Sequence, residues 1–153
     1  MLEMWHFYVT PTVAYVPTVA KTEAGFFLDV EPIEAVSIAD RQQIQAALKR
    51  AILSGNPTVP TPDRETLSKS AVLRYANART WASFEKRASC WEITKRADQY
   101  VVQRMKRRSD RGWEDDPSNA EALPLDIAID ELVARMTARA LPLRSDPARH
   151  QRA

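Results

Sequence analysis

The segment at residues 40–55 constrains the fold more than any other part of the sequence, because it carries both ends of a helix. Asp40 followed by Gln43 forms a capping box, which satisfies free amide groups at a helix start. The apolar positions recur at helical spacing and are Ile44, Ala47, Leu48, Ala51 and Ile52. Gly55 supplies a left-handed stop, and Pro57 cannot continue a helix. A helix with one apolar stripe has to pack on a second layer, so the rest of the chain must supply that layer.

The second layer is predicted to be a sheet. Segments rich in β-branched and aromatic residues, or alternating between polar and apolar, cover residues 5–10, 12–20, 26–31, 71–75, 89–95 and 99–107. Pro32 interrupts the third of these, and residues 33–38 alternate after it. Pro11 and Pro17 remove amide donors, so the first two strands are expected to lie at an edge or to carry a bend.

Two further helices complete the predicted architecture, a short one over residues 78–87 and a longer amphipathic one over residues 127–140. Three prolines within residues 56–70 indicate an ordered, stiff connector. The sequence therefore predicts a single α+β domain over residues 1–142. Its antiparallel or mixed sheet has about five to six strands and carries two main helices and one short helix. Residues 143–153 have no apolar period and are expected to form a disordered C-terminal tail.

Few residues in this chain are suited to catalysis. There are two histidines, and His6 lies in a predicted strand while His150 lies in the tail, so a two-histidine catalytic or metal centre has no support. The single cysteine, Cys90, is expected to be a buried, unreactive thiol, and this cysteine usage suggests the cytoplasm. Three glycines cannot build a glycine-rich phosphate loop. We therefore predict no catalytic residues, no metal and no cofactor, and no apolar stretch approaches the about 18 residues of a membrane span.

The net charge of +2 conceals a basic middle segment, residues 61–110, with 12 basic and 6 acidic side chains. Its densest part consists of Arg104, Lys106, Arg107 and Arg108. With Trp91 and Tyr100 on the same hairpin, these side chains could bind phosphates while the aromatic rings stack on bases. Because the overall charge is small and an acidic loop follows directly, nucleic-acid binding by the 99–108 strand is the alternative hypothesis, not the first.

The acidic loop is the leading candidate for a partner-binding site. It contains Asp110, Trp113, Glu114, Asp115 and Asp116. The consecutive carboxylates lack the alternate spacing of a calcium loop. A tryptophan is a typical anchor of protein interfaces, and its acidic neighbours would attract a cationic partner. The other interpretation is a solvated turn.

Three segments together resemble a family of small bacterial proteins. They are residues 15–32, which include Gly25-Phe26-Phe27-Leu28-Asp29-Val30-Glu31-Pro32, residues 55–60 and residues 108–117. Some members of that family are similar to immunity proteins of contact-dependent growth inhibition systems.

The resemblance implies a non-enzymatic, cytoplasmic protein that binds one cognate toxin domain, in many systems a nuclease, and blocks it. It supplies no family motif for the interface, so the acidic loop around Trp113 is placed there by its chemistry alone. The resemblance does not identify the toxin, and the oligomeric state stays open, since exposed aromatic residues could also mark a contact between copies of the chain.

Overall fold

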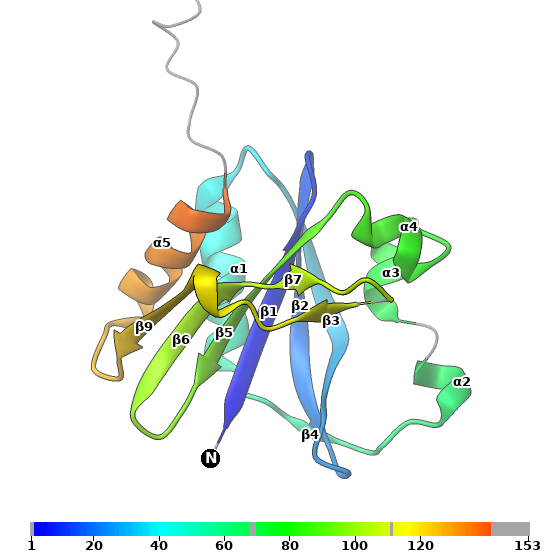
Figure 1. Ribbon diagram of the computed structural model, residues 1–153, viewed down its shortest axis with the longest axis horizontal. Coiled ribbons are helices and arrows are strands. Elements are labelled where there is room, and N and C mark those ends of the chain that lie inside the picture. Colours follow the sequence, from blue (N-terminus) through cyan, green and yellow to red (C-terminus); the bar gives the residue numbers. More distant parts are fainter. Residues whose placement is uncertain (1, 68–69, 111, 142–153) are drawn as a thin grey trace, which may run out of the picture.

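The computed structural model describes residues 2–67, 70–110 and 112–141. Within these residues the main sheet has seven strands, six of them in the order β3-β2-β1-β5-β6-β9, while β4 pairs with β2 (Figure 1). The strands are β1 (Glu3–Val9), β2 (Val13–Thr22), β3 (Phe27–Ser37), β4 (Thr58–Val59), β5 (Ser89–Lys95), β6 (Gln99–Arg104) and β9 (Ala120–Pro124). All of these pairs are antiparallel except β2 with β4. The predicted α+β class with an antiparallel or mixed sheet is confirmed, and the described main sheet has seven strands where about five to six were predicted.

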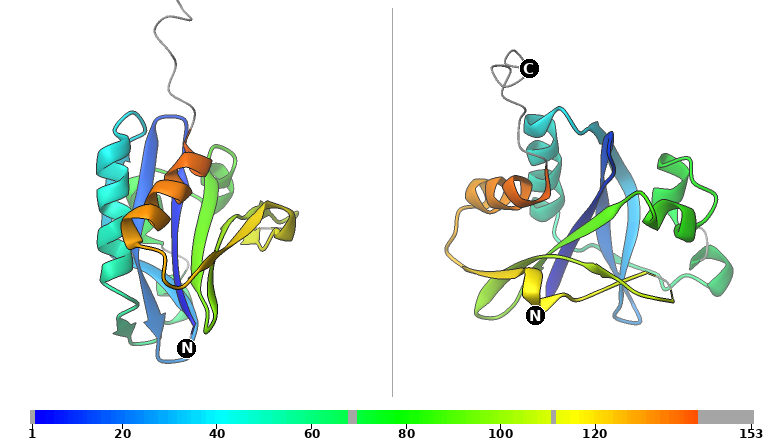
Figure 2. Two further views of the ribbon diagram at one scale, coloured as in Figure 1. Left: turned by 90° about the vertical axis from the view of Figure 1, so that its left-hand side faces the viewer. Right: turned by 45° about the horizontal axis from the view of Figure 1, so that its top comes forward.

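The two main helices lie on one face of the sheet, and a small hairpin projects from the other (Figure 2). The helices are α1 (Arg41–Leu53) and α5 (Ile129–Ala140). The hairpin pairs β7 (Lys106–Arg107) with β8 (Trp113–Glu114). The shorter helical elements are α2 (Arg64–Leu67), α3 (Ala71–Tyr75), α4 (Trp81–Glu85) and the 3-10 helix η1 (Pro117–Asn119).

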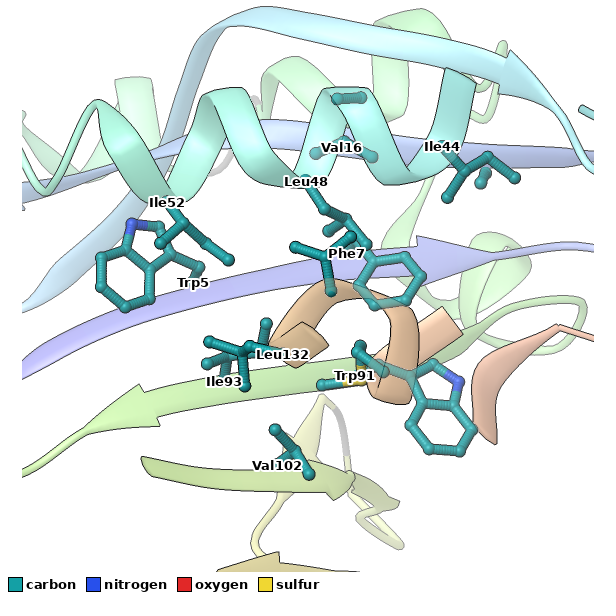
Figure 3. Packing of buried hydrophobic residues seen from close by; sticks show 14 of the residues in the cluster. Trp5, Phe7, Val16, Ile44, Leu48, Ile52, Trp91, Ile93, Val102 and Leu132 are labelled. Atoms are coloured by element: carbon teal, nitrogen blue, oxygen red, sulfur yellow. The ribbon is translucent and has the colours of Figure 1, made fainter. Parts of the chain in front are cut away.

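Helix α1 begins and ends where its sequence signals predict. The Asp40 side chain accepts a hydrogen bond from the Gln43 amide at 3.1 Å, and Gly55 follows the helix with a φ of +66°. Its buried positions are Ile44, Ala47, Leu48 and Ile52. Leu48 points towards Phe7 of β1 in the core between α1 and the sheet (Figure 3).

A second apolar cluster covers part of the opposite face of the sheet, beneath α3 and α4. Its buried members are Tyr8, Tyr15, Ile33, Val72, Leu73, Ala76, Phe84 and Cys90. Cys90 is a buried free thiol, as expected, and burial raises its pKa well above the ordinary value. Because a thiolate is the reactive form, this environment keeps the side chain unreactive.

The prolines of the N-terminal strands shape the sheet without ending it. The register between β2 and β3 shifts between Pro17 and Thr18, so the predicted bend is confirmed, although β2 lies inside the sheet. Pairing of β1 with β2 is confined to the β1 residues Tyr8 and Val9. Strand β3 runs through Pro32, but the predicted interruption is present in its pairing: Val30 pairs with Thr18 and Ile33 with Pro17, while Glu31 and Pro32 between them have no ladder partner in β2. Because β3 is an edge strand, the sheet does not need a hydrogen bond from the amide donor that Pro32 lacks.

The strand predicted over residues 71–75 is wrong, because these residues form helix α3. Val72 and Leu73 are adjacent and both buried, whereas a strand would direct them to opposite faces. The hydroxyl of Ser70 accepts from the Val72 amide at 3.3 Å and caps the helix. The predicted helix over residues 78–87 is confirmed in a shorter form as α4. Strand β9 was not predicted.

The start of the connector is held against the sheet through β4, where the Lys21 amide donates to the Pro57 carbonyl at 2.9 Å. The predicted tail, residues 143–153, lies outside the described residues, as does the end of the predicted domain at residue 142. Among the helices that the structure describes, none has the length and apolar character needed to cross a membrane.

Candidate functional site

The residues predicted to bind a partner gather on the β7–β8 hairpin and the turn after it. Trp113 and Glu114 form β8, where they lie opposite Arg107 and Lys106 of β7. Asp115 follows β8 directly, and the left view of Figure 2 shows the hairpin standing clear of the main sheet. The fold therefore places the acidic loop and the basic cluster in one small unit.

Most acidic side chains of this unit already have partners inside it. Asp110 accepts from two guanidinium nitrogens of Arg108, both at 3.0 Å, and Asp115 accepts from the Gln103 amide group at 3.1 Å. Hydrogen bonds from the side chains of η1 lower the pKa of Asp116 below its ordinary value. The field that these carboxylates offer to a cationic partner is smaller than their number suggests.

The basic side chains are likewise close to acidic ones. Lys106 lies opposite Glu114 across the hairpin, and a guanidinium nitrogen of Arg107 lies 4.0 Å from a carboxylate oxygen of Glu85. Arg104 is exposed at the end of β6. Because charges of both signs alternate over this surface, it offers no uniform basic track for a phosphate backbone.

The base-stacking part of the nucleic-acid hypothesis is wrong. Trp91 is 8% exposed and Tyr100 is 4% exposed, and both belong to the core beneath α1 and α5. Strand alternation correctly separated the two faces of this hairpin. It did not reveal that the face with the aromatic rings is the one that the helices cover.

Trp113 belongs to an aromatic cluster that joins three distant parts of the chain. Its ring centroid lies 5.5 Å from that of Tyr8 in β1 and 6.0 Å from that of Trp81 in α4. Both indoles are half-buried. A hollow of about 300 Å³ is lined by Tyr8, Trp81, Glu85, Gly112 and Trp113. Sequence reasoning found Trp113 and missed its two aromatic partners, since nothing local connects residues so far apart.

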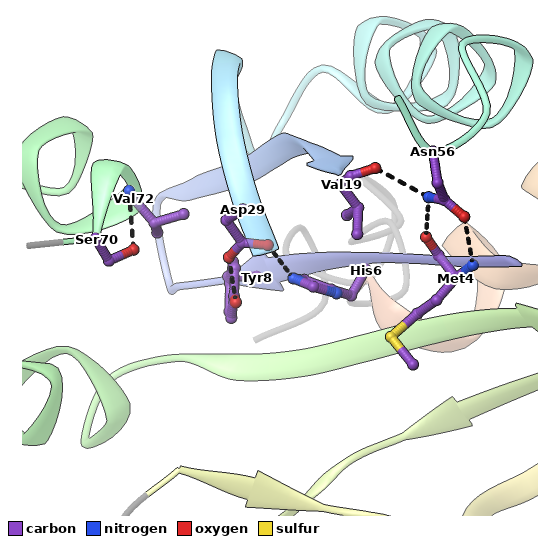
Figure 4. Close-up of polar contacts among 8 residues, drawn as sticks. All are labelled: Met4, His6, Tyr8, Val19, Asp29, Asn56, Ser70 and Val72. Atoms are coloured by element: carbon purple, nitrogen blue, oxygen red, sulfur yellow. Dashed lines mark hydrogen bonds and ion pairs between the residues drawn. The ribbon is translucent and has the colours of Figure 1, made fainter. Parts of the chain in front are cut away.

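A buried polar cluster beside these rings was also missed. Asp29 of β3 reaches across to β1, where one carboxylate oxygen contacts Nε2 of His6 and the other accepts from the Tyr8 hydroxyl at 2.7 Å (Figure 4). Burial lowers the pKa of His6, but attraction and hydrogen bonding to Asp29 outweigh this, so the net shift is upward. The only sequence signal is that His6 and Tyr8 share a strand face.

Glu92 of β5 adds a second buried carboxyl to this face, at 7% exposure. Burial raises its pKa above the ordinary value of 4.5, although the nearby His6 opposes the shift. Its Oε1 accepts from the Thr94 hydroxyl at 3.1 Å and from the Gln103 amide group at 3.4 Å. These two hydrogen bonds lower the pKa of Glu92, but burial outweighs them and the net shift is upward.

We expect the Glu92→Gln variant to be more stable than the wild type at neutral pH. A raised pKa contributes stability below the unfolded value, and this contribution is lost as pH rises through the folded value. Glutamine keeps the accepting oxygen and removes the ionisation, so its advantage should vanish below the ordinary pKa of 4.5. Urea midpoints at neutral and acidic pH measure this. A glutamine variant that is less stable than wild type at neutral pH would contradict it.

A hollow of about 450 Å³ lies between β3 and helices α2 and α3. Asp29 borders it, and an ion pair at 3.3 Å joins Glu31 to Arg74 on its wall. His6 and Glu92 do not line it, so the buried polar cluster does not converge on this space. Over the residues that the structure describes, no group of histidine, cysteine and acidic side chains is arranged to hold a metal ion.

Comparison with known proteins gives similarity in fold alone. No family model matches the chain, and no curated protein is similar to it in sequence. A solved protein of unknown function from Neisseria meningitidis is 11% identical with a TM-score of 0.60, over 90% of this chain and 92% of that one. A chain of the CdiA-CT/CdiI toxin and immunity complex from Yersinia pseudotuberculosis is 12% identical with a TM-score of 0.59, over 93% and 98% of the two chains.

Proposed function

We propose that this chain is a non-enzymatic immunity protein that binds a cognate toxin domain in the cytoplasm and neutralises it. The observation that carries the proposal is the projecting β7–β8 hairpin, with the half-buried Trp113 and its hollow beside it. Two further points support it: three segments resemble a family of small bacterial proteins of which some are similar to immunity proteins, and the fold is similar to that of a chain from a toxin and immunity complex.

A protein inhibitor needs a rigid scaffold with a few well-placed anchors, and this hairpin provides them. Trp113 is fixed by β7 on one side and by the rings of Tyr8 and Trp81 on the other. An indole held in this way loses little conformational entropy when a partner covers it, which is typical of an interface hot spot. Around it, Glu114 and Lys106 supply a charged rim that would set the orientation of the partner.

Under this proposal a toxin domain is encoded beside the gene for this chain, and the test of the proposed function uses that domain. Co-expression of the chain should protect cells from that domain, and the two proteins should co-purify. Failure to protect and to form a complex would refute the immunity role. Catalytic turnover by the purified chain alone would refute the non-enzymatic part, and salt-sensitive retention on RNA would favour the alternative of nucleic-acid binding.

We expect Trp113→Ala to weaken the complex with the toxin domain by roughly 30-fold, as for a hot-spot residue worth about 2 kcal/mol. The matched control is Tyr75→Ala, which removes an aromatic ring that is 43% exposed and lies outside the hairpin. Calorimetric titration gives both affinities, and urea midpoints show that both variants are folded. Wild-type affinity in Trp113→Ala would exclude the hairpin from the interface.

A further inference from the structure

The hollow beside Trp113 has the form of an aromatic cage. The rings of Trp81 and Trp113 stand at 84° to each other, with centroids 6.0 Å apart, so they form two walls that meet at a right angle. The Tyr8 ring completes the lining, with its centroid 5.9 Å from that of Trp81. Three electron-rich ring systems around one space of about 300 Å³ favour a cation over a neutral group.

A carboxylate in the same lining strengthens this preference. Glu85 of α4 is 4% exposed, and its Oε1 accepts a hydrogen bond from the Gly112 amide at 2.9 Å. Its Oε2 lies 4.0 Å from the Arg107 guanidinium, which is beyond hydrogen-bonding distance. A second donor can therefore still approach this oxygen. A buried carboxylate in the same lining, whose own cationic neighbour is no closer than 4.0 Å, is favourably placed for a second, closer cation.

The chain's own Arg107 indicates which cation fits best. A guanidinium already lies close to Glu85, but Arg107 is outside the lining of the hollow and its side chain is 49% exposed. A planar guanidinium stacks on an indole and donates several hydrogen bonds in one plane, which a compact ammonium does not. An arginine that stacked on one indole face in this hollow could therefore use the ring and the carboxylate together.

We infer that the cage formed by Tyr8, Trp81, Trp113 and Glu85 binds an arginine side chain of the protein partner. The inference rests on the proposed function, and it names the chemistry that the partner must present at this hairpin. It also gives Glu85 a role in recognition, although neither Glu85 nor Trp81 belongs to the acidic loop. A toxin domain with a basic surface would supply such a side chain.

The experiment needs no toxin domain. Purified chain is titrated with N-acetyl-arginine amide and with the corresponding citrulline amide, whose urea group has nearly the same shape but no charge. The indole N–H signals of Trp81 and Trp113 in an NMR spectrum report binding at the cage. We expect saturable binding of the arginine compound in the millimolar range, about two- to fivefold tighter than the citrulline compound.

Two variants separate the charge of the cage from its shape. Glu85→Gln keeps an oxygen for the Gly112 amide, so the fold should be retained, and it should weaken arginine binding by about two- to fivefold without changing citrulline binding. Tyr75→Ala, outside the cage, should change neither. Equal binding of the two compounds, or arginine binding that leaves both indole signals in place, would overturn the inference.

The inference and the proposed function can fail separately. If the toxin domain binds the chain while the arginine compound does not reach the cage, the cage is wrong and the immunity role stands. If the arginine compound binds the cage but the chain neither protects cells nor binds the toxin domain, the immunity role is wrong. With the complex in hand, Glu85→Gln should also weaken toxin binding by about two- to fivefold.

Discussion

The Asp29→Ala variant is expected to lose about 3–5 kcal/mol of unfolding free energy below pH 6.5, where His6 is charged, the cost of removing one partner from a buried ion pair. The change leaves the imidazole of His6 and the hydroxyl of Tyr8 buried without their common acceptor. The Asp29 side chain is itself 8% exposed, so the groups that lose it lie largely inside the fold. Urea unfolding followed by circular dichroism measures the loss.

The pH dependence of this loss provides its control. Because the pKa of His6 is raised above 6.5 in the fold, the charged form contributes stability below that value. This contribution disappears as pH rises through the folded pKa, so the gap between wild type and Asp29→Ala should narrow in alkaline solution. Asp29→Asn, which can still accept from Tyr8, should lose less than Asp29→Ala. A loss below about 1 kcal/mol, the value of an exposed pair, would contradict a structural role for this carboxylate.

Elements that carry their own start and stop signals were predictable from the sequence. Asp40 and Gly55 bound α1 in the structure as they do in the pattern, because capping and left-handed stops act within a few residues. The β5–β6 hairpin follows from alternation and a short turn in the same way. In these places local and tertiary preferences agree, so the local signal is sufficient.

In short segments without such signals, tertiary contacts determine the secondary structure. Residues 71–75 contain β-branched and aromatic side chains, yet packing of Val72 and Leu73 against the sheet selects a helix. Strand β9 carries few strand-forming residues and exists because β6 offers it an edge. A run of five residues has too little pattern for periodicity alone to distinguish a strand from a helical turn.

The candidate site shows the same division between local and distant information. The hairpin residues around Trp113 are close in sequence, so their composition alone was sufficient to identify them as one candidate site. The cage and the Asp29 cluster each join residues from several elements, and they depend on strand order, which the sequence did not provide. Sequence reasoning therefore found the projecting part of the surface and missed the buried groups that support it.

The Asn56 side chain bridges β1 and β2 where these strands are not paired. Its replacement by alanine is expected to cost about 2–4 kcal/mol of unfolding free energy, because several partly buried backbone groups would lose their partners. Pairing of β1 with β2 stops near Tyr8, and beyond that point the Asn56 side chain bridges the two strands (Figure 4). It accepts from the Met4 amide at 3.0 Å and donates to the carbonyls of Met4 and Val19 at 2.8 and 2.9 Å. Urea unfolding measures the loss of unfolding free energy. Faster hydrogen exchange of the Met4 amide would show that the loss arises at this bridge.

The Asn56→Asp variant tests whether donation by this side chain is what matters. A carboxylate can still accept from the Met4 amide, but it places negative charge against two carbonyl oxygens, so we expect a loss at least as large as that of alanine. Protonation of the new carboxyl restores one donor, and the loss should therefore diminish in acid. Asn119→Ala, which removes an exposed hydrogen bond at 2.6 Å to Asp116, should cost less than about 1 kcal/mol. If Asn56→Ala cost no more than Asn119→Ala, the two strands would be held together by the sheet and the helices alone, and the bridging role of Asn56 would be refuted.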